Sequence, residues 1–513
     1  MYQSYELENP LSKIIDKPRE NFTREDLIHV IEKENIERIT FHYTALDGKL
    51  KELKLPFSNR HQAERILAEG ERVDGSSLFK GMVDVSVSDL YVVPLYKTAF
   101  LNPLERGSLD FVCRYLTKEG ELAPFALDTI LHRANTLFRE RTNLEFYTLG
   151  ELEFYLISHQ RSGDYPSPKQ RGYHSAAPFS KKGRVLNEML TEITKITGNI
   201  KYAHSEVGCI KDVHSDLREL KGMHAQQMEV EFLPAPVEES ADNLVIARWM
   251  IRNIASRHGC IATFTPKLEE DAAGNGMHVH MQLRQNGKNV MTDTDGDLSE
   301  KARMMIGGLC HYADSLMAFG NTVSSAYLRL VPNQEAPTRV CWSNSNRSAM
   351  IRTPLGWSTV NNLAKILNPQ QLNDLDNTVG QQTVEIRTPD GSAITHLLLA
   401  GLTAAAEWGL THSEESLNLA KDLYVTGNIF NNKELLNKLT SLPQSCQASS
   451  RILLEKRELY ERDNLFPTSI IDYMAKLLQK ENDEFINPHL IGLTTDDRLH
   501  ETRKIMHKDL HRH

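Results

Sequence analysis

The spacing of hydrophobic residues predicts a small α+β domain at the start of the chain. Apolar side chains recur at helical spacing over residues 23–36, which open with the capping-box variant Thr23 and Asp26, and predict a helix. Residues 39–43 alternate apolar with polar up to a turn at Asp47-Gly48, which predicts a strand entering a hairpin. The pattern continues with a strand at 50–55, a short helix at 61–68, and strands at 89–95 and 109–115.

The rest of the chain predicts a larger α+β domain with antiparallel strands in its middle. Residues 127–141 have the spacing of an amphipathic helix, short strands follow it, and helices dominate from residue 397 onward. We therefore divide the chain into an N-terminal tail at 1–22, a small domain at 23–123 and a large domain at 124–513.

Four of the predicted strands share an unusual chemical pattern. Alternate side chains of a strand point to the same face, so each of these strands has one apolar and one polar face. The residues that share the polar faces are Glu151 with Glu153, Glu229 with Glu231, His278 with His280 and Gln282, and Glu385 with Arg387.

A solvated sheet face alternates in the same way, but it usually mixes lysine, threonine and serine. These four faces are mostly glutamate and histidine and contain no lysine. Carboxylates placed so close together repel one another unless a cation lies among them, and carboxylates with one imidazole suit Mg²⁺ or Mn²⁺. The strands together predict a divalent-cation pocket, although the His278-x-His280 pair alone is equally typical of zinc sites and of core histidines.

A second group of candidate residues is cationic. Arginine presents a planar set of donors that matches carboxylate and phosphate oxygens, so several arginines in segments rich in Asn, Ser and Pro indicate a ligand that carries both groups. They are Arg329, Arg339, Arg347, Arg352 and Arg387. The sequence has no GxxxxGK[ST] motif and no strand-linked GxGxxG, so we expect metal and arginine to hold any phosphate.

Composition narrows the class of protein. The formal net charge of −9 disfavours binding to nucleic acid or to an anionic membrane. The longest nearly apolar stretch, residues 397–406, is about half of the ~20 residues that a membrane span needs. The acidic N-terminus lacks the apolar core of a signal peptide, and the six cysteines form no CxxC pair, so we expect a cytoplasmic protein with reduced thiols.

Ordered motifs over residues 24–405 resemble the glutamine synthetase family. They are VDGSS (73–77) with Ser88-Asp89, the ExEF of 151–154, Gly172-Tyr173, Glu206, QMEV (227–230), GNGMHVHMQL (274–283), RLVPNQEAP (329–337), NRSAMIRTP (346–354) and VEIRTPD (384–390). The resemblance implies a small β-grasp-like N-terminal domain, followed by a catalytic domain with a curved antiparallel sheet flanked by helices.

The resemblance also implies two or more Mg²⁺ or Mn²⁺ ions in each site, with ATP as co-substrate. One metal would be held by Glu153, Glu206 and Glu229, and a second by Glu151, His278 and Glu385. Arg329, Arg387 and the backbone of Gly274 would bind the glutamate substrate, while Arg347, Arg352, His280 and Gln282 would lie beside the nucleotide and its phosphates.

For the remaining residues, the resemblance implies that Glu335 lies on a flap that closes the site. Asp74, Ser77, Asp89, Tyr173 and Glu206 would form the ammonium pocket, with Asp74 taking the proton of the bound ammonium. In the family's homo-oligomeric ring, a hexamer or a dodecamer, the N-terminal domain of one subunit completes the site of its neighbour.

The resemblance thus implies an ATP-dependent glutamate–ammonia ligase. A γ-glutamyl ligase that uses an amine or polyamine is a second interpretation, because an organic amine is also cationic. A non-catalytic structural relative is a third, because Gln282 and Thr383 replace a Ser and an Arg that bacterial members place along the nucleotide.

Overall fold

A computed structural model describes residues 5–83, 88–160, 169–331, 336–356, 360, 362–375 and 380–512. The N-terminal part is built on a six-stranded sheet in the order β2-β1-β6-β4-β3, with β5 paired to β6. The parallel pair is β1 with β6, and the other pairs of this sheet are antiparallel. Its elements are α1 (Pro10–Ile15), α2 (Arg24–Lys33), β1 (Arg38–Thr44), β2 (Leu50–Pro56), α3 (Arg60–Glu69), β3 (Glu71–Asp74), α4 (Gly75–Leu78), β4 (Asp89–Pro94), β5 (Phe100–Leu101) and β6 (Ser108–Leu116).

Local sequence signals explain how this domain begins and turns. Thr23 and Asp26 form the predicted reciprocal capping box at the start of α2. Gly48 has a φ of 75° in the turn between β1 and β2, a conformation that glycine adopts without strain. The predicted tail at 1–22 also contains ordered structure, because Asn9 caps α1 and Leu11 is fully buried. A six-residue helix is too short to produce a recognisable hydrophobic period, so its sequence gave no helical signal.

In the described part of the chain, the C-terminal domain contains a ten-stranded sheet in the order β14-β15-β16-β12-β7-β9-β8. Strands β10 and β11 pair with β7, and β13 pairs with β12. The sheet is antiparallel, as predicted, apart from the parallel pair β14 and β15. The strands are β7 (Glu145–His159), β8 (Ile200–Ile210), β9 (Met223–Phe232), β10 (Ala235–Pro236), β11 (Ile261–Thr263), β12 (Val279–Gln285), β13 (Lys288–Asn289), β14 (Trp342–Asn344), β15 (Ile351–Thr353) and β16 (Val384–Ile386).

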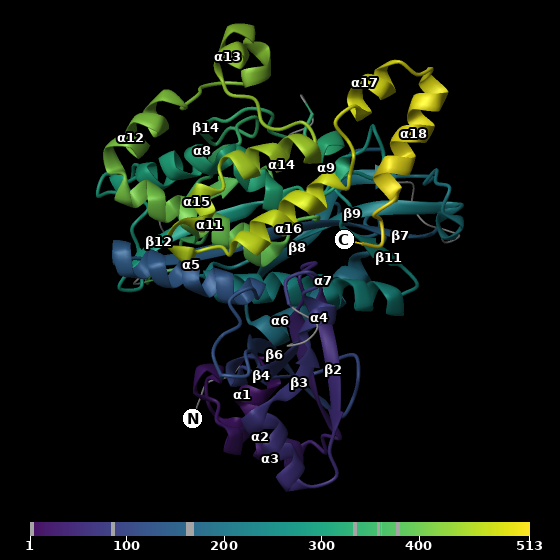
Figure 1. Cartoon of the computed structure of the whole chain (residues 1–513), viewed down its shortest axis with the longest axis vertical. Helices are drawn as coiled ribbons and strands as arrows, with labels where there is room; N and C mark the ends of the chain where they lie inside the picture. The colour runs from purple at the N-terminus through teal and green to yellow at the C-terminus, as the bar shows by residue number, and fades with distance from the viewer. Residues whose placement is uncertain are drawn as a thin grey trace.

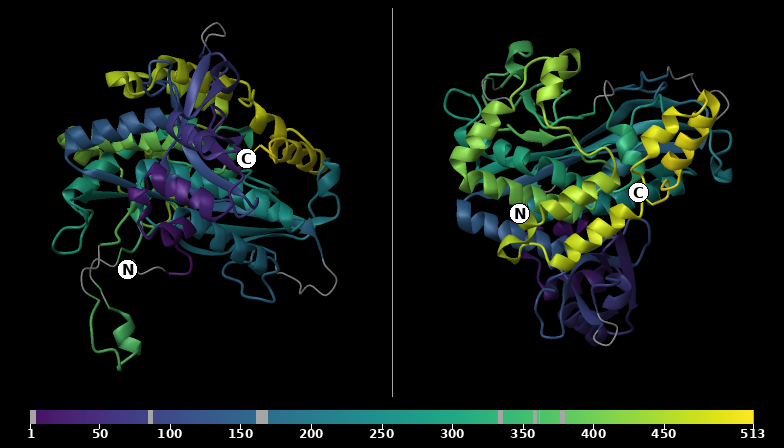
Figure 2. Two further views of the ribbon diagram at one scale, coloured as in Figure 1. Left: turned by 90° about the horizontal axis from the view of Figure 1, so that it is seen from below. Right: turned by 45° about the horizontal axis from the view of Figure 1, so that its top comes forward.

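Helices cover this sheet and separate it from the N-terminal domain. Figure 1 shows the N-terminal domain below, next to α5 (Leu127–Thr142), α6 (Gly183–Thr197) and α7 (Val237–Arg257), with α8 (Glu300–Gly320) and α11 (Thr395–Thr411) among the helices above. The other helices are α9 (Ser324–Arg329), α10 (Ala364–Leu367), α12 (Ser413–Asp422), α13 (Lys433–Lys438), α14 (Cys446–Glu455), α15 (Glu458–Glu461), α16 (Thr468–Gln479), α17 (Ile486–Ile491) and α18 (Thr495–His507). The segment that carries α10 projects from the body of the molecule (Figure 2, left, green). None of the described helices has the length and hydropathy that a membrane span requires.

Candidate active site

The four strands with acidic and imidazole faces are neighbours in the large sheet. Strand β12 lies between β16 and β7, and β9 follows on the other side of β7. The pairing sets His280 opposite Glu385, and Glu153 opposite Glu229. The polar faces that the alternation predicted within single strands therefore meet in one region of the sheet.

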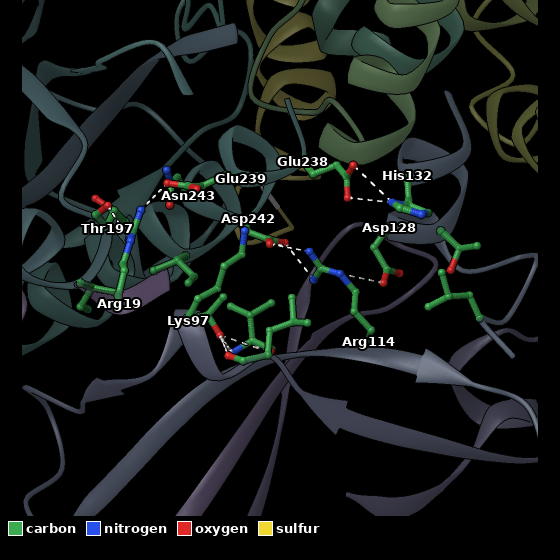
Figure 3. Close-up of a pocket in the computed structure, with 17 residues that line it drawn as sticks. Arg19, Lys97, Arg114, Asp128, His132, Thr197, Glu238, Glu239, Asp242 and Asn243 are labelled. Atoms are coloured by element: carbon green, nitrogen blue, oxygen red, sulfur yellow. Dashed lines mark hydrogen bonds and ion pairs between the residues drawn. The ribbon is translucent and has the colours of Figure 1, made fainter. Parts of the chain in front are cut away.

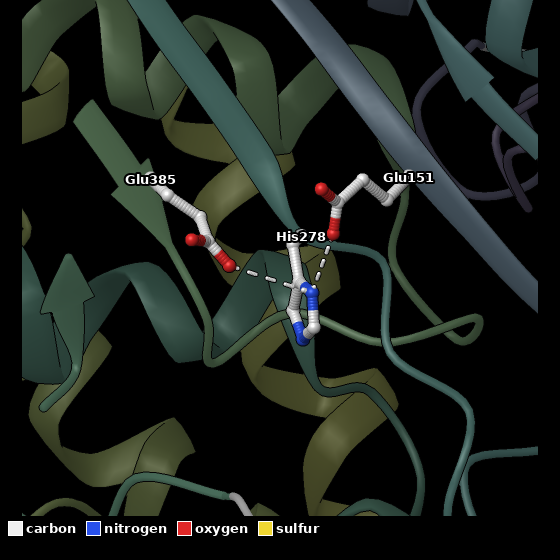
Figure 4. Close-up of side chains that lie close together, drawn as sticks. All are labelled: Glu151, His278 and Glu385. Carbon is white, nitrogen blue, oxygen red and sulfur yellow. Dashed lines mark hydrogen bonds and ion pairs between the residues drawn. The ribbon is translucent and has the colours of Figure 1, made fainter. Parts of the chain in front are cut away.

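One cluster consists of Glu151, His278 and Glu385, which come from β7, the residue before β12, and β16. The Nδ1 atom of His278 lies 2.8 Å from Glu151 Oε2 and 3.6 Å from Glu385 Oε1 (Figure 4). One ligand atom from each of the three residues lies within 4.8 Å of the others. The structure thus brings together one of the two metal-binding trios expected from the sequence.

A second cluster consists of His204, Glu206 and Glu229, whose ligand atoms also lie within 4.8 Å of one another. Glu153, which we expected beside Glu206 and Glu229, lines the same cavity but accepts a 2.6 Å hydrogen bond from the backbone N–H of Gly276. His204 was not among the residues predicted from the sequence. The alternation of side chains along a strand could have identified it, because His204 and Glu206 are two residues apart in β8 and share a face.

The electrostatics of these clusters fit a divalent cation. Burial raises the pKa of Glu229 well above its usual range, and the nearby carboxylates of Glu151, Glu153, Glu206 and Glu385 raise it further. Carboxylate oxygens with an imidazole are the donors that Mg²⁺ or Mn²⁺ accepts, and a cation among them would remove the repulsion. The residues present therefore fit the metals that the sequence predicts.

Arginines border the first cluster. Glu385 accepts hydrogen bonds of 2.7 Å from both Arg352 and Arg387. Although burial raises its pKa, Arg387 and His280 outweigh that effect and lower the pKa of Glu385 to about 2. Arg329 is buried and donates to the backbone carbonyls of Thr388 and Arg387.

These residues line a cavity of about 350 Å³ that also includes Gly274, Tyr173, Arg347 and Glu206. Arg339 does not line it, because its guanidinium donates to the carbonyl of Leu436. Arg339 is therefore not one of the arginines of the candidate site. The arginines that line the cavity are Arg329, Arg347, Arg352 and Arg387.

The two residues expected along the nucleotide, His280 and Gln282, are buried and do not line this cavity. His280 lies with Nε2 2.9 Å from Glu151 and Nδ1 2.9 Å from Thr383. Gln282 donates to the carbonyl of Gly380 and accepts from Arg284. His280 therefore contacts Glu151, a candidate metal ligand, from outside the cavity.

Three buried side chains hold successive carbonyls of the loop at Gly274. Lys267 donates to Ala272 at 2.6 Å, Tyr155 to Ala273 at 2.7 Å, and Gln227 to Gly274 at 2.9 Å. None of the three donors was predicted to have a role in the site, because their contacts join distant segments. A Cβ atom at Gly274 would lie 2.6 Å from the carbonyl oxygen of Pro266, so only glycine fits there.

The expected ammonium-binding residues divide between two places. Asp74, Ser77 and Asp89 are exposed on the N-terminal domain, where Ser77 donates to Asp74 at 2.6 Å and Asp74 is paired with Asp89 across β3 and β4. Tyr173 and Glu206 line the cavity, and the three N-terminal residues do not. Glu335 lies outside the described residues.

Comparisons with known proteins show which family the chain resembles. The sequence model of the glutamine synthetase catalytic domain matches residues 129–489, and that of the glutamine synthetase β-grasp domain matches residues 35–118. The chain is 26% identical to glutamine synthetase of Aquifex aeolicus over 492 residues, which cover 90% of this chain and 96% of the relative. It is 30% identical to that of Pyrococcus horikoshii over 398 residues, which cover 77% and 78% of the two chains.

Solved structures share the fold. GmaS without ligand superposes with a TM-score of 0.69 at 19% identity, covering 92% of this chain and 98% of the other. Glutamine synthetase of Plasmodium falciparum gives a TM-score of 0.68 at 19% identity, covering 93% and 98%. With the catalytic-domain match spanning more than half of its length, the chain belongs to the glutamine synthetase family, a family of ligases.

Proposed function

We propose that this protein ligates ammonia to the γ-carboxylate of L-glutamate at the expense of ATP, giving glutamine, ADP and phosphate. One observation carries the proposal: two clusters of carboxylate and imidazole groups share a cavity with four arginines. A site that must hold both a carboxylate and a polyphosphate needs this combination of divalent-cation ligands and guanidinium groups.

In this proposal Glu151, His278 and Glu385 hold one divalent cation, and Glu153, Glu206 and Glu229 hold the other, with His204 beside them. When bound, the two cations supply positive charge that neutralises the oxygens of the transferred phosphoryl group. The ADP complex of GmaS, a protein of the same fold, supports the assignment of the nucleotide.

Arg329, Arg387 and the backbone of Gly274 orient the glutamate in the proposed reaction, and Arg347 and Arg352 face the phosphates. The γ-carboxylate of glutamate attacks the γ-phosphorus of ATP, ADP leaves, and a γ-glutamyl phosphate forms. Ammonia then attacks the acyl carbon and releases phosphate. Water would compete with ammonia for this acyl phosphate, so the reaction needs a closed site. In the proposed enzyme, Glu335 belongs to the flap that closes it.

The proposed ammonium pocket combines Tyr173 and Glu206 with Asp74, Ser77 and Asp89 from a neighbouring subunit. Hydrogen bonds from the hydroxyls of Ser77 and Ser76 lower the pKa of Asp74 to about 2. These hydrogen bonds keep the Asp74 carboxylate ionised, so that it can hold the ammonium and take its proton. The shared site requires a homo-oligomeric ring, and sedimentation of a monomer at micromolar concentration would contradict it.

An organic amine is a second candidate acceptor, and the aromatic side chains at the cavity favour it. Tyr173 and Tyr202 are half-exposed, and their rings lie 5.4 Å and 5.6 Å from the ring of His204. Aromatic faces attract organic ammonium groups.

The deciding experiment measures ADP release by the purified protein with ATP, Mg²⁺ and glutamate. Ammonium is compared with a panel of primary amines and with no acceptor. We expect ammonium-selective turnover, and the ammonium-dependent kcat/KM should fall in Asp74→Ala because the exposed carboxylate is lost. Turnover with amines alone would reassign the acceptor, and no turnover with any acceptor would indicate a non-catalytic relative.

Glu151→Gln tests the metal assignment separately. Removing a charged ligand should cost at least about 100-fold in kcat/KM, since even groups that only orient metal ligands cost 10- to 100-fold. Glu105→Gln on the N-terminal domain is the control, because this partly exposed carboxylate pairs with Lys54 and Arg38 and does not line the cavity.

A further inference from the structure

A second cavity, of about 300 Å³, lies where the N-terminal domain meets the catalytic domain (Figure 3). The segment 95–98 and strand β6 form the wall on the N-terminal side, and the first turns of α5 and α7 form the other wall. None of its lining residues belongs to the candidate active site.

Most charged groups of this cavity are paired with one another. Arg19 pairs with Glu239, and His132 pairs with Glu238 at 3.1 Å. Arg114 is shared by two carboxylates, at 2.6 Å from Asp242 and 3.3 Å from Asp128. One guanidinium for two carboxylates leaves a negative charge in excess.

Asp128 is the carboxylate that lacks full compensation. Asp242 has a second partner in His396, whereas Asp128 forms an ion pair with Arg114 alone among the described residues. Burial raises the pKa of Asp128, although Arg114 opposes that effect. The adjacent Thr129 hydroxyl is buried and has no hydrogen-bond partner in the described structure.

Donors without partners lie in the same cavity. The side-chain amide nitrogen of Asn243 is buried and makes no hydrogen bond within the described residues. Lys97 has neither an ion pair nor a hydrogen bond there, and Figure 3 shows it reaching from the N-terminal domain toward Asp242. In that view Lys97 and Asn243 lie to one side of Arg114, and Asp128 lies to the other.

We propose that this cavity, named the junction site, binds a free α-amino acid with a short aliphatic side chain. The ammonium group of the ligand meets Asp128 and Thr129, and its carboxylate meets Lys97 and the amide of Asn243. Its aliphatic part packs on the apolar residues of the wall, which are Leu95, Val112, Leu122, Ile196 and Ile246. A zwitterion is the ligand that offers an ammonium to the buried Asp128 and a carboxylate to Lys97 and Asn243 at the same time.

Helix α7 connects the junction site to the candidate active site. Asn243 and Asp242 line the junction site, and the next residue, Leu244, packs on Gly150 so closely that a Cβ atom there would lie 2.6 Å from it. Gly150 directly precedes Glu151. The ligand would therefore contact the helix that supports a candidate metal-binding strand.

Isothermal titration calorimetry of the full chain tests the proposal with L-alanine and L-valine, and with two molecules that each keep one charge of valine. Isobutylamine lacks the carboxylate and isovalerate lacks the ammonium. We expect the amino acids to bind and each partial molecule to bind at least about tenfold more weakly, since a hydrogen bond to a charged group is lost. Failure of both amino acids to bind, or equal binding of isobutylamine or isovalerate, would overturn the proposal.

Two variants locate the binding. Lys97→Met changes an exposed residue and Thr129→Val removes a hydroxyl without a partner, so both variants should fold, and each should weaken binding about tenfold. Thr395→Val is the matched control, because its hydroxyl is also buried without a partner among the described residues but lies outside the junction site. Loss of binding in Arg329→Gln, with normal binding in Lys97→Met, would assign the amino acid to the candidate active site and refute the junction site.

Discussion

The chain contains two buried charge clusters that differ in how their carboxylates are neutralised. At the junction between the domains, burial raises the pKa of Asp242, but Arg114 and His396 outweigh it and hold the pKa at about 2. In the candidate active site, burial raises the pKa of Glu229 well above its usual range, and four neighbouring carboxylates add to the rise. Arg114 and His396 thus stabilise the charge of Asp242, whereas the imidazole 3.7 Å from Glu229 is that of His204, whose pKa is lowered by burial.

The difference separates a carboxylate that the chain itself neutralises from one that it does not. A carboxylate paired within the chain contributes to the stability of the folded protein, whereas uncompensated carboxylates favour binding of an external cation. The active-site cluster is therefore poised for a ligand that the protein itself does not supply.

The largest expected effect comes from Arg114→Met. It leaves Asp128 and Asp242 buried without their shared guanidinium, which should lower the free energy of unfolding by about 3–5 kcal/mol. Urea denaturation measures the loss. The exposed Arg65→Met, which breaks only a surface pair with Glu69, should change stability by less than about 1 kcal/mol. Equal effects of the two substitutions would mean that the junction cluster does not stabilise the folded protein.

Divalent cations should stabilise the protein through the active-site cluster and not through the junction cluster. At a concentration of about one hundred times Kd, Mg²⁺ or Mn²⁺ should raise the free energy of unfolding by about 2.7 kcal/mol. The increment should shrink in Glu229→Gln and persist in Asp242→Asn, because only Glu229 belongs to the proposed metal site. Thermal unfolding with and without metal checks this, and an increment unchanged in Glu229→Gln would count against the site.

Acid should lower the contribution of Asp242 at the junction to the free energy of unfolding. The pKa of Asp242 is about 2 in the folded protein, against an ordinary value of 3.8, so its ionisation stabilises the fold above the ordinary pKa. That contribution, on the order of 2 kcal/mol, is lost as the pH falls from about 5 to about 2. The stability of the wild-type protein should therefore fall toward that of Asp242→Asn over this range. A difference between the two proteins that stays constant with pH would contradict the assignment.

The smallest expected effect is that of Glu229→Gln on the free energy of unfolding of the metal-free protein. Glu229→Gln removes a charge from a repulsive cluster, so the metal-free protein should keep its free energy of unfolding or gain about 1 kcal/mol. In the same variant, turnover should be lost. A clear destabilisation of the metal-free variant, measured by urea denaturation, would mean that Glu229 is structural.

The local pattern of the sequence was enough to predict the elements and the chemistry of single strands. The capping box of α2, the turn at Gly48 and the polar faces of β7, β9, β12 and β16 all depend on residues within a few positions of one another. Helix α1 was missed because six residues carry too little periodic signal.

Contacts between distant segments needed the structure. Tyr155, Gln227 and Lys267 reach the loop at Gly274 from three different segments, and no spacing in the sequence relates them. Arg339 looked equivalent to the other arginines, yet its guanidinium donates to Leu436.

The sequence by itself determined which residues share a face, because side-chain direction alternates with a period of two along any strand. It also determined the family, through motifs that hold their order along the chain. Only the tertiary structure decided which faces meet and that His204 joins Glu206 and Glu229. It also decided that the junction leaves Lys97 and the amide nitrogen of Asn243 without partners among the described residues. The physical reason is that strand neighbours and domain contacts depend on packing between segments far apart in sequence, which a local period does not encode.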